Sequence, residues 1–282
     1  MSIIKLYNTP PWEWPDNAGK TIYGVLCDVN VAPGERTMAA ELAGDVTVID
    51  DHMAKTLLSI LQNNAEDDML RCQAAISLGP VLEETYLQEN DEADEIEVDM
   101  GLSFSLFEEM QRDMQHIYMN ADVPQLVRRR SLEASVRAPR QWHRNAVRAA
   151  YASGNYYWQL TAVFCMGYVD GFNDQIIEAL TDERKSIRFE AVCAAGNQGL
   201  TAAWPHIQKI LKDAQTDKDL LVAAIDAVAP MHPEKAGGVV GPFIESPDPD
   251  IAEAALECLF MADALLDLDD DDLEDFIDDD IF

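Results

Sequence analysis

The residues of this chain that could do chemistry are arginines and aromatic residues between positions 128 and 158. From residue 125 to residue 148 the sequence holds seven arginines and a single acidic residue, Glu133. Guanidinium groups bind carboxylates and phosphates through paired hydrogen bonds, and Arg, Trp and Tyr contribute most to protein interfaces. We therefore predict a binding region made of Arg128, Arg129, Arg130, Arg137, Arg140, Trp142, Arg144, Arg148, Tyr156 and Trp158. We call these ten residues the arginine island.

Motifs for catalysis, metal binding or cofactor binding do not occur in the sequence. There is no Cys-x-x-Cys pair, phosphate-binding loop, nucleophile elbow or H-E-x-x-H motif among the 282 residues. The aspartate run 267–272 lacks the Gly and the Glu that a calcium-binding EF-hand loop needs. We predict no catalytic residue, no metal site and no cofactor.

The net charge of −32 is concentrated in two segments. Residues 83–99 hold nine acidic residues and residues 263–282 hold eleven, with no Lys or Arg in either. Because such charge repels phosphate backbones and anionic lipids, we expect no duplex nucleic acid and no membrane as partner. No apolar run of 18 residues and no signal peptide is recognisable, and the five cysteines are scattered, so we expect a cytoplasmic protein.

The last three arginines of the island lie four residues apart, at 140, 144 and 148, with no acid between them. Like charges at this spacing repel each other on a helix, which favours an anionic contact. The acidic segments of the same chain, residues 83–99 (an insertion) or residues 263–282 (the tail), are the first candidates for this contact.

A repeat of about 31 residues runs along the chain. Seven similar segments begin at residues 35, 70, 127, 158, 187, 220 and 251, and each has Ala or Ser four positions later. Nine positions after the start, five of them carry a small residue on the same helical stripe, where another helix can approach closely. These residues are Gly44, Gly79, Gly167, Gly196 and Ala229.

A second amphipathic stretch precedes each segment, so each repeat is predicted to be a hairpin of an outer and an inner helix. The outer stretches are residues 20–29, 52–62, 104–119, 141–151, 174–180, 203–211 and 236–243. We expect Asn30, Asp122 and Asp182 to cap inner helices, because short polar side chains accept hydrogen bonds from the first helical N–H groups. Pro80 and Pro230 predict a kink or an early helix end.

The segments Asp182…Ile187-Arg188-Phe189-Glu190-Ala191 and Asp122…Val127-Arg128 resemble the inner helix of HEAT-repeat proteins. The resemblance implies an all-α, right-handed α-solenoid of about seven HEAT-like helical hairpins. It also implies a ladder of Asp and Arg between neighbouring repeats. Because the segments at 158, 220 and 251 lack the arginine, we expect this ladder to be broken in the C-terminal half.

The predicted organisation is an N-terminal extended segment at 1–14, one continuous solenoid domain at 15–262 with an acidic insertion at about 83–103, and an acidic-hydrophobic tail at 263–282. The tail is typical either of a segment that orders only on a partner or of a polar cap on the repeat array.

The function we expect is a non-enzymatic scaffold or adaptor that binds an unknown partner protein through the concave inner-helix face, with the arginine island as its centre. Di-iron deoxyhypusine hydroxylases resemble this fold but depend on paired His-Glu dipeptides, and none occurs here. The alternative is an enzyme or binder that takes an anionic small molecule or nucleic acid at residues 128–148, as HEAT-like glycosylases or lyases would.

Overall fold

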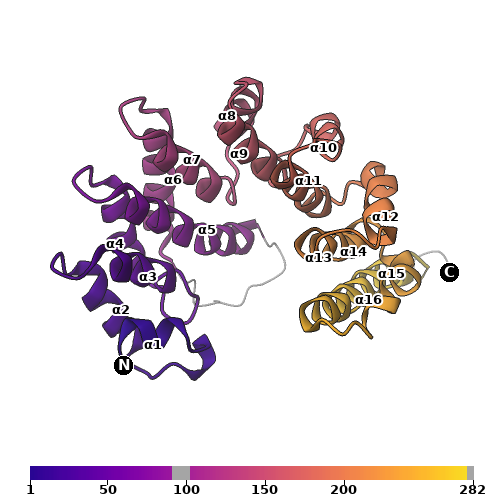
Figure 1. The fold of residues 1–282 in the computed structure, drawn as a ribbon, viewed down its shortest axis with the longest axis horizontal. Helices are drawn as coiled ribbons and strands as arrows, with labels where there is room; N and C mark the ends of the chain where they lie inside the picture. Colours follow the sequence, from indigo (N-terminus) through magenta and orange to yellow (C-terminus); the bar gives the residue numbers. More distant parts are fainter. Residues whose placement is uncertain (91–101, 278–282) are drawn as a thin grey trace. The chain divides into compact units, whose positions relative to one another are not determined.

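The protein is all-α. The computed structural model describes residues 1–90 and 102–277, without the side chains of residues 90 and 268–277. Within these ranges all the regular structure is helical and there is no strand (Figure 1). Seven outer helices alternate with seven inner helices along the chain, so the prediction of an all-α array of helical hairpins is confirmed.

The helices follow the predicted hairpin pattern closely. The outer helices are α2 (Ala18–Cys27), α4 (Asp51–Gln62), α6 (Phe104–Met119), α8 (Gln141–Ala152), α10 (Asn173–Ala179), α12 (Trp204–Lys212) and α15 (Pro233–Val240). The inner helices are α3 (Pro33–Leu42), α5 (Asp68–Asn90), α7 (Gln125–Ser135), α9 (Tyr156–Met166), α11 (Lys185–Asn197), α13 (Lys218–Asp226) and α16 (Pro249–Ile277). The short elements are α1 (Ile3–Tyr7), η1 (Pro11–Glu13), η2 (Thr201–Ala203), α14 (Val228–Met231) and η3 (Gly241–Phe243).

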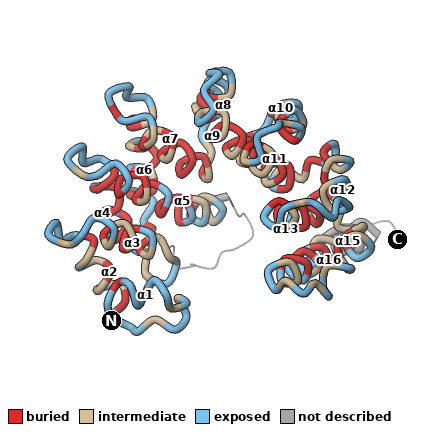
Figure 2. The backbone as a smooth tube through the Cα atoms, in the orientation of Figure 1, coloured by how far each residue is buried: buried red, intermediate tan, exposed pale blue. Residues whose placement is uncertain are grey.

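The array divides into two compact units, Met1–His143 and Arg144–Phe282, where the sequence predicted one domain. In the first unit α3, α5 and α7 pack in succession, and in the second unit α9, α11, α13 and α16 do so. Buried residues form stripes on the helices of each unit (Figure 2).

Successive inner helices approach each other at the predicted stripe of small residues. A Cβ added to Gly44, just after the end of α3, would lie 2.5 Å from the carbonyl oxygen of Ser77 in α5, and one added to Gly196 of α11 would lie 3.1 Å from the Cα of Ala227. Gly167 lies in the same way against the Cα of Ala194, at 3.3 Å. A side chain at Gly44 would therefore force the two helices to shift, and one at Gly167 or Gly196 would require the neighbouring residues to move by a few tenths of an ångström.

Inner-helix arginines tie each hairpin of the first unit together. The Nε atoms of Arg36, Arg71 and Arg128 donate to backbone carbonyls ten residues earlier, at 3.1, 3.0 and 2.7 Å. Each of these carbonyls belongs to the penultimate residue of the outer helix. The last carbonyls of a helix lack partners within the helix and carry its negative dipole end, so a guanidinium stabilises them.

Ion pairs connect neighbouring repeats in both units. In the first unit Arg36 pairs with Glu66 through two hydrogen bonds of 2.7 and 2.9 Å. In the second unit, where the segments at 220 and 251 lack the arginine, lysines at the starts of α11 and α13 make such pairs instead of arginines. The pairs are Lys185 with Asp217 (3.5 Å) and Lys218 with Asp248 (2.8 Å) and Asp250 (2.5 Å).

The predicted helix caps are wrong at all three positions. The inner helices α3, α7 and α11 are preceded by Ala32, Pro124 and Arg184, and none has a side-chain cap. Asp182 instead accepts a hydrogen bond from the backbone N–H of Arg184, within a turn ahead of the helix. A short polar residue can satisfy a turn as well as a helix end, so its presence near a helix start did not locate the cap. Side chains do cap other helices, from Asp50, Asn155 and Asp217.

Of the kink or early helix end predicted at Pro80, the early end does not occur, because α5 continues through the proline to Asn90. Leu78, Val81 and Leu82 on either side of the proline are almost fully buried, which holds both halves of the helix in place. Residues 83–90 of the predicted acidic insertion are therefore helical, and residues 91–101 lie outside the described residues. Pro230 lies in the four-residue α14, which follows the end of α13 at Asp226.

The two ends of the chain are more helical than predicted. Residues 1–14 are not an extended segment, because they contain the short helices α1 and η1. Ile3 and Leu6 of α1 are buried in the core of the first unit. In the tail, α16 continues to Ile277, so residues 263–277 are helical. Residues 278–282 lie outside the described residues.

Replacing Gly44 tests the close approach of α3 and α5. Gly44→Ala is expected to lower the free energy of unfolding by about 1–3 kcal/mol, because its Cβ overlaps the backbone of Ser77. The matched control is Gly24→Ala in α2, whose Cβ would meet nothing within 4 Å, and which is expected to be neutral or to stabilise by up to about 1 kcal/mol. Urea unfolding followed by circular dichroism measures both, and an equal effect of the two variants would contradict the packing described.

Candidate functional site

The structure divides the arginine island between the two units. Residues 128, 129, 130, 137, 140 and 142 belong to the first unit, whereas residues 144, 148, 156 and 158 belong to the second. The ten residues predicted from the sequence therefore fall into two sets, one in each unit.

Acidic side chains already pair with the arginines of the first set. Arg129 and Arg130 both contact Glu133, the first at 3.5 Å. The remaining pairs join different helices: Arg137 with Glu83 of α5 (2.5 Å) and Arg140 with Glu108 of α6 (2.6 Å). Of the three arginines for which the sequence predicted mutual repulsion, Arg140 thus has an acidic partner within the first unit, from a residue far from it in the sequence.

Packing also engages Arg128 and Trp142. The guanidinium of Arg128 ties α7 to α6 and lies 5.9 Å from the ring centre of Tyr118. The half-buried Trp142 stacks on His143, with ring centres 3.8 Å apart. Both residues stabilise the first unit. From the sequence alone, this structural role could not be distinguished from partner binding.

The residues of the second set are more exposed. Arg144 has its guanidinium against Gly171, a residue with φ of 88°, and the exposed Arg148 donates to the side chain of Asn145 at 3.3 Å. The hydroxyl of Tyr156 lies 2.6 Å from that of Ser186. Trp158 at the start of α9 is half-buried. In the described part of the second unit, no carboxylate pairs with Arg144 or Arg148.

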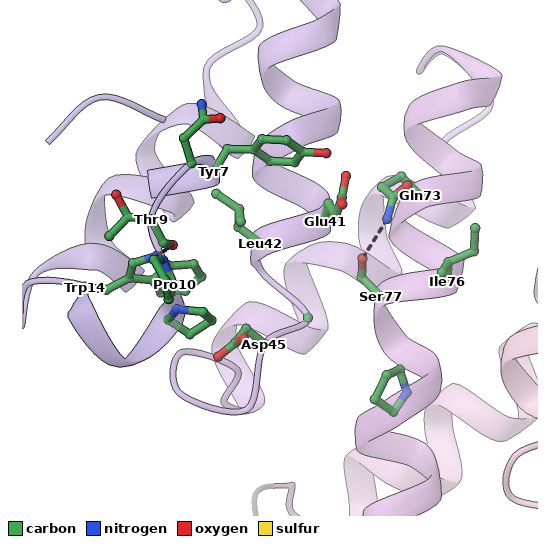
Figure 3. Close-up of a pocket in the computed structure, with 14 residues that line it drawn as sticks. Tyr7, Thr9, Pro10, Trp14, Glu41, Leu42, Asp45, Gln73, Ile76 and Ser77 are labelled. Carbon is green, nitrogen blue, oxygen red and sulfur yellow. Dashed lines mark hydrogen bonds between the residues drawn. The ribbon is translucent and has the colours of Figure 1, made fainter. Parts of the chain in front are cut away.

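A groove on the inner-helix face of the first unit is the better candidate for a binding site (Figure 3). Its volume is about 650 Å³, and it lies between the N-terminal residues 7–14, the C-terminal end of α3 and the middle of α5. We call it the N-terminal groove. Its walls come from residues that are far apart in the sequence and that only the fold brings together.

Trp14 holds the N-terminal wall of this groove in place. Its indole Nε1 donates to the backbone oxygens of Leu6 and Thr9, at 3.1 and 2.7 Å. These two bonds fold residues 7–14 back over α3, with Pro10 and Pro11 on the groove side. Because Trp14 uses its only donor on the backbone, it offers a bound molecule an apolar ring alone.

The chemistry of the N-terminal groove is acidic and apolar. Glu41 and Asp45 line it, and no Lys, Arg or His does. Asp45 accepts two hydrogen bonds from Thr47 on one oxygen, at 2.9 and 2.6 Å, and the side chain of Glu41 has no hydrogen bond or ion pair among the described residues. The ring of the 44% exposed Tyr7 extends toward Glu41 (Figure 3). Such a surface suits a cationic side chain carried on an apolar stem.

The sequence analysis missed these groove residues. The available signal was the run Tyr7-Asn8-Thr9-Pro10-Pro11-Trp12-Glu13-Trp14, in which aromatic residues and prolines directly precede the first repeat. Aromatic residues at the edge of a repeat array are candidates for interfaces. The opposite side of the groove comes from Glu41 and from the Gln73–Ser77 turn of α5. These are ordinary helical positions, and nothing in their residue types indicated a binding site.

The described residues contain no group of three or more His, Cys, Asp or Glu side chains placed to hold a metal ion. A search of the described helices for one that could cross a lipid bilayer, by length and apolar character, also finds none.

No protein-family model and no curated protein matches this chain. Human deoxyhypusine hydroxylase in complex with glycerol is similar in structure at 14% identity and a TM-score of 0.41, over 93% of this chain and 88% of the other. Escherichia coli YibA matches at 14% identity and a TM-score of 0.44, over 91% and 86%. The complex of CpcE and CpcF of phycocyanin lyase from Nostoc matches at 14% and 0.43, over 90% and 98%. Similarity at this level says nothing about the activity, ligand or partner of this protein.

Variants of Arg128 and Arg148 test whether residues of the arginine island stabilise the fold. Arg128→Gln is expected to lower the free energy of unfolding by about 1–2 kcal/mol, because the carbonyl of Tyr118 loses its donor. Arg148→Gln removes the same charge from an exposed site and is expected to stay within about 0.5 kcal/mol of the wild type. Thermal and urea unfolding measure both. Equal stability of the two variants would show that Arg128 does not tie the hairpin.

His143, in the first turn of α8, is a fully buried, neutral imidazole. Its Nδ1 accepts from the backbone N–H of Arg140 at 2.8 Å, so the proton lies on Nε2, which donates to Ser135 at 3.0 Å. With a proton already facing Ser135, the imidazole is not a base for that hydroxyl. Burial lowers the pKa of His143 from 6.5 to about 4, because the charged form loses its hydration.

This burial predicts a pH dependence of stability. Between pH 6.5 and 4 the unfolded chain binds a proton at His143 that the folded protein does not, so the free energy of unfolding falls as the pH falls through this range. The loss is about 3 kcal/mol in total, since a tenfold change in proton affinity is about 1.4 kcal/mol. His143→Gln removes the titration, and its stability between pH 7 and 4.5 is expected to fall less than that of the wild type. His116→Gln, at an exposed histidine, is expected to retain the wild-type dependence.

Proposed function

We propose that the protein is a non-enzymatic adaptor that binds a partner protein through the inner-helix face of its first unit. The observation that carries the proposal is the N-terminal groove, a cavity of about 650 Å³ with two acidic and several apolar side chains and no basic one. Extended grooves along stacked inner helices are the usual binding surfaces of helical-repeat proteins. The HEAT-like pattern of the hairpins supports the same role.

The partner segment in this proposal is basic and extended. A Lys or Arg side chain between Glu41 and Asp45 would supply the positive charge that the groove lacks, and its stem or a neighbouring proline would cover Pro10, Pro11 and Ile76. The net charge of −32 would accelerate the approach of such a partner. A cytoplasmic location fits the five free cysteines.

Binding of an anionic molecule at the arginine island is the second candidate. Its supporting observation is that Arg144 and Arg148 are exposed and face no carboxylate among the described residues. In the first unit, however, an anion would have to displace Glu83, Glu108 and Glu133 from their arginines. We therefore place this candidate after the N-terminal groove.

Peptide binding tests the proposal. A fluorescein-labelled peptide of alternating Lys and Pro is expected to bind the full chain with an affinity that falls as salt is added, whereas its Glu-Pro counterpart is expected not to bind. Glu41→Gln is expected to weaken binding about threefold to fivefold, the effect of one exposed ion pair. Fluorescence anisotropy measures each affinity.

The matched control is Glu84→Gln, an exposed acid of α5 outside the groove, whose affinity is expected to stay within about twofold of the wild type. If both variants weaken binding equally, the peptide responds only to the overall charge, and the groove is not the site.

A further inference from the structure

The second unit contains another cavity, with the opposite charge. Its volume is about 430 Å³, and its walls come from the end of α10, the start of α11, helix α12 and the turn between α12 and α13. Lys185, Arg188, His206 and Lys209 all line it. In a chain with 52 acidic and 20 basic residues, such a gathering of basic side chains from separate elements is unusual.

Arg188 differs from the other inner-helix arginines at its repeat position. Those of the first unit use Nε to hold the end of their outer helix, but Arg188 donates only through Nη1, to the backbone oxygens of Asp182 (2.8 Å) and Glu183 (3.3 Å). Its Nε and Nη2 have no acceptor among the described residues. A guanidinium at the cavity wall therefore keeps hydrogen-bond donors that a ligand can use.

The acids that line the cavity are already engaged. Asp217 caps α13 through the N–H of Leu220 and lies 3.5 Å from Lys185, and Asp213 accepts from the backbone N–H of Gln215. Lys209, in contrast, is exposed and has no ion pair in the described part of the chain. The lining thus carries three positive charges against two negative ones, with His206 as a further donor, so its formal charge is positive.

We propose that this cavity binds the phosphate group of a small phosphorylated molecule. Arg188, Lys209 and His206 provide donors from two helices to a multiply charged oxyanion, which has more acceptor oxygens than a carboxylate. The cavity is larger than a phosphate ion, and Thr181, Gln215 and Thr216 give the remaining space a polar wall suited to hydroxyl groups. This site is separate from the N-terminal groove, and the adaptor function does not depend on it.

Titration of the ¹⁵N-labelled full chain with inorganic phosphate at constant ionic strength tests this site. Saturable shifts are expected for amides near residues 181–188 and 206–217. Arg188→Gln is expected to weaken binding at least tenfold, and Lys209→Gln about threefold to fivefold. Lys212→Gln lies one turn further on α12, outside this cavity, and is expected to change the affinity less than twofold.

Two further ligands test which class of molecule this cavity binds. Glycerol 3-phosphate is expected to bind more tightly than inorganic phosphate, and acetate is expected to produce no saturable shift. If Arg188→Gln does not fold, the comparison of Lys209→Gln with Lys212→Gln decides. Absence of saturation up to about 20 mM phosphate, an affinity a thousandfold weaker than a typical small-molecule site, overturns the proposal. Equal effects of the two lysine variants, or acetate binding as well as phosphate, overturn it too.

Discussion

The close approach of successive inner helices is the constraint on which the rest of the structure depends. Glycine in or just after one inner helix meets backbone or alanine of the next repeat, at Gly44 and Ser77 and again at Gly196 and Ala227. At these distances the helices have little freedom to slide or rotate, because interiors are packed as densely as crystals. The register so fixed places the arginine ties, the interhelical ion pairs and both cavities.

Arginine has three roles in this protein, and its position in the fold decides between them. At the inner-helix position it ties the hairpins of the first unit, as Arg71 does with almost no exposure. After α7 it pairs with carboxylates of neighbouring helices, as Arg137 does with Glu83. Arg188 does neither completely and borders a cavity. A cluster of arginines in a sequence is therefore a poor guide to a binding site unless their partners are known.

The helices could be predicted from the sequence and the candidate sites could not, for one physical reason. Helix formation and the small-residue stripe depend on residues three to nine positions apart, so periodicity reveals them. The partners of Arg137 and Arg140 come from other helices, and the walls of the N-terminal groove come from residues 7–14 and 73–80. The prediction of helix caps failed for another reason: a residue such as Asp182 can accept a hydrogen bond within a turn as readily as at a helix start.

The bonds from Trp14 to Leu6 and Thr9 have a consequence for the order of events during synthesis. This N-terminal wall can close as soon as its own residues leave the ribosome, since its contacts are local. Helix α5 must follow before Gln73 and Ser77 complete the groove. A nascent chain would thus display half of the groove, with its apolar side chains uncovered, until about 80 residues have emerged. During that interval a chaperone could bind these side chains.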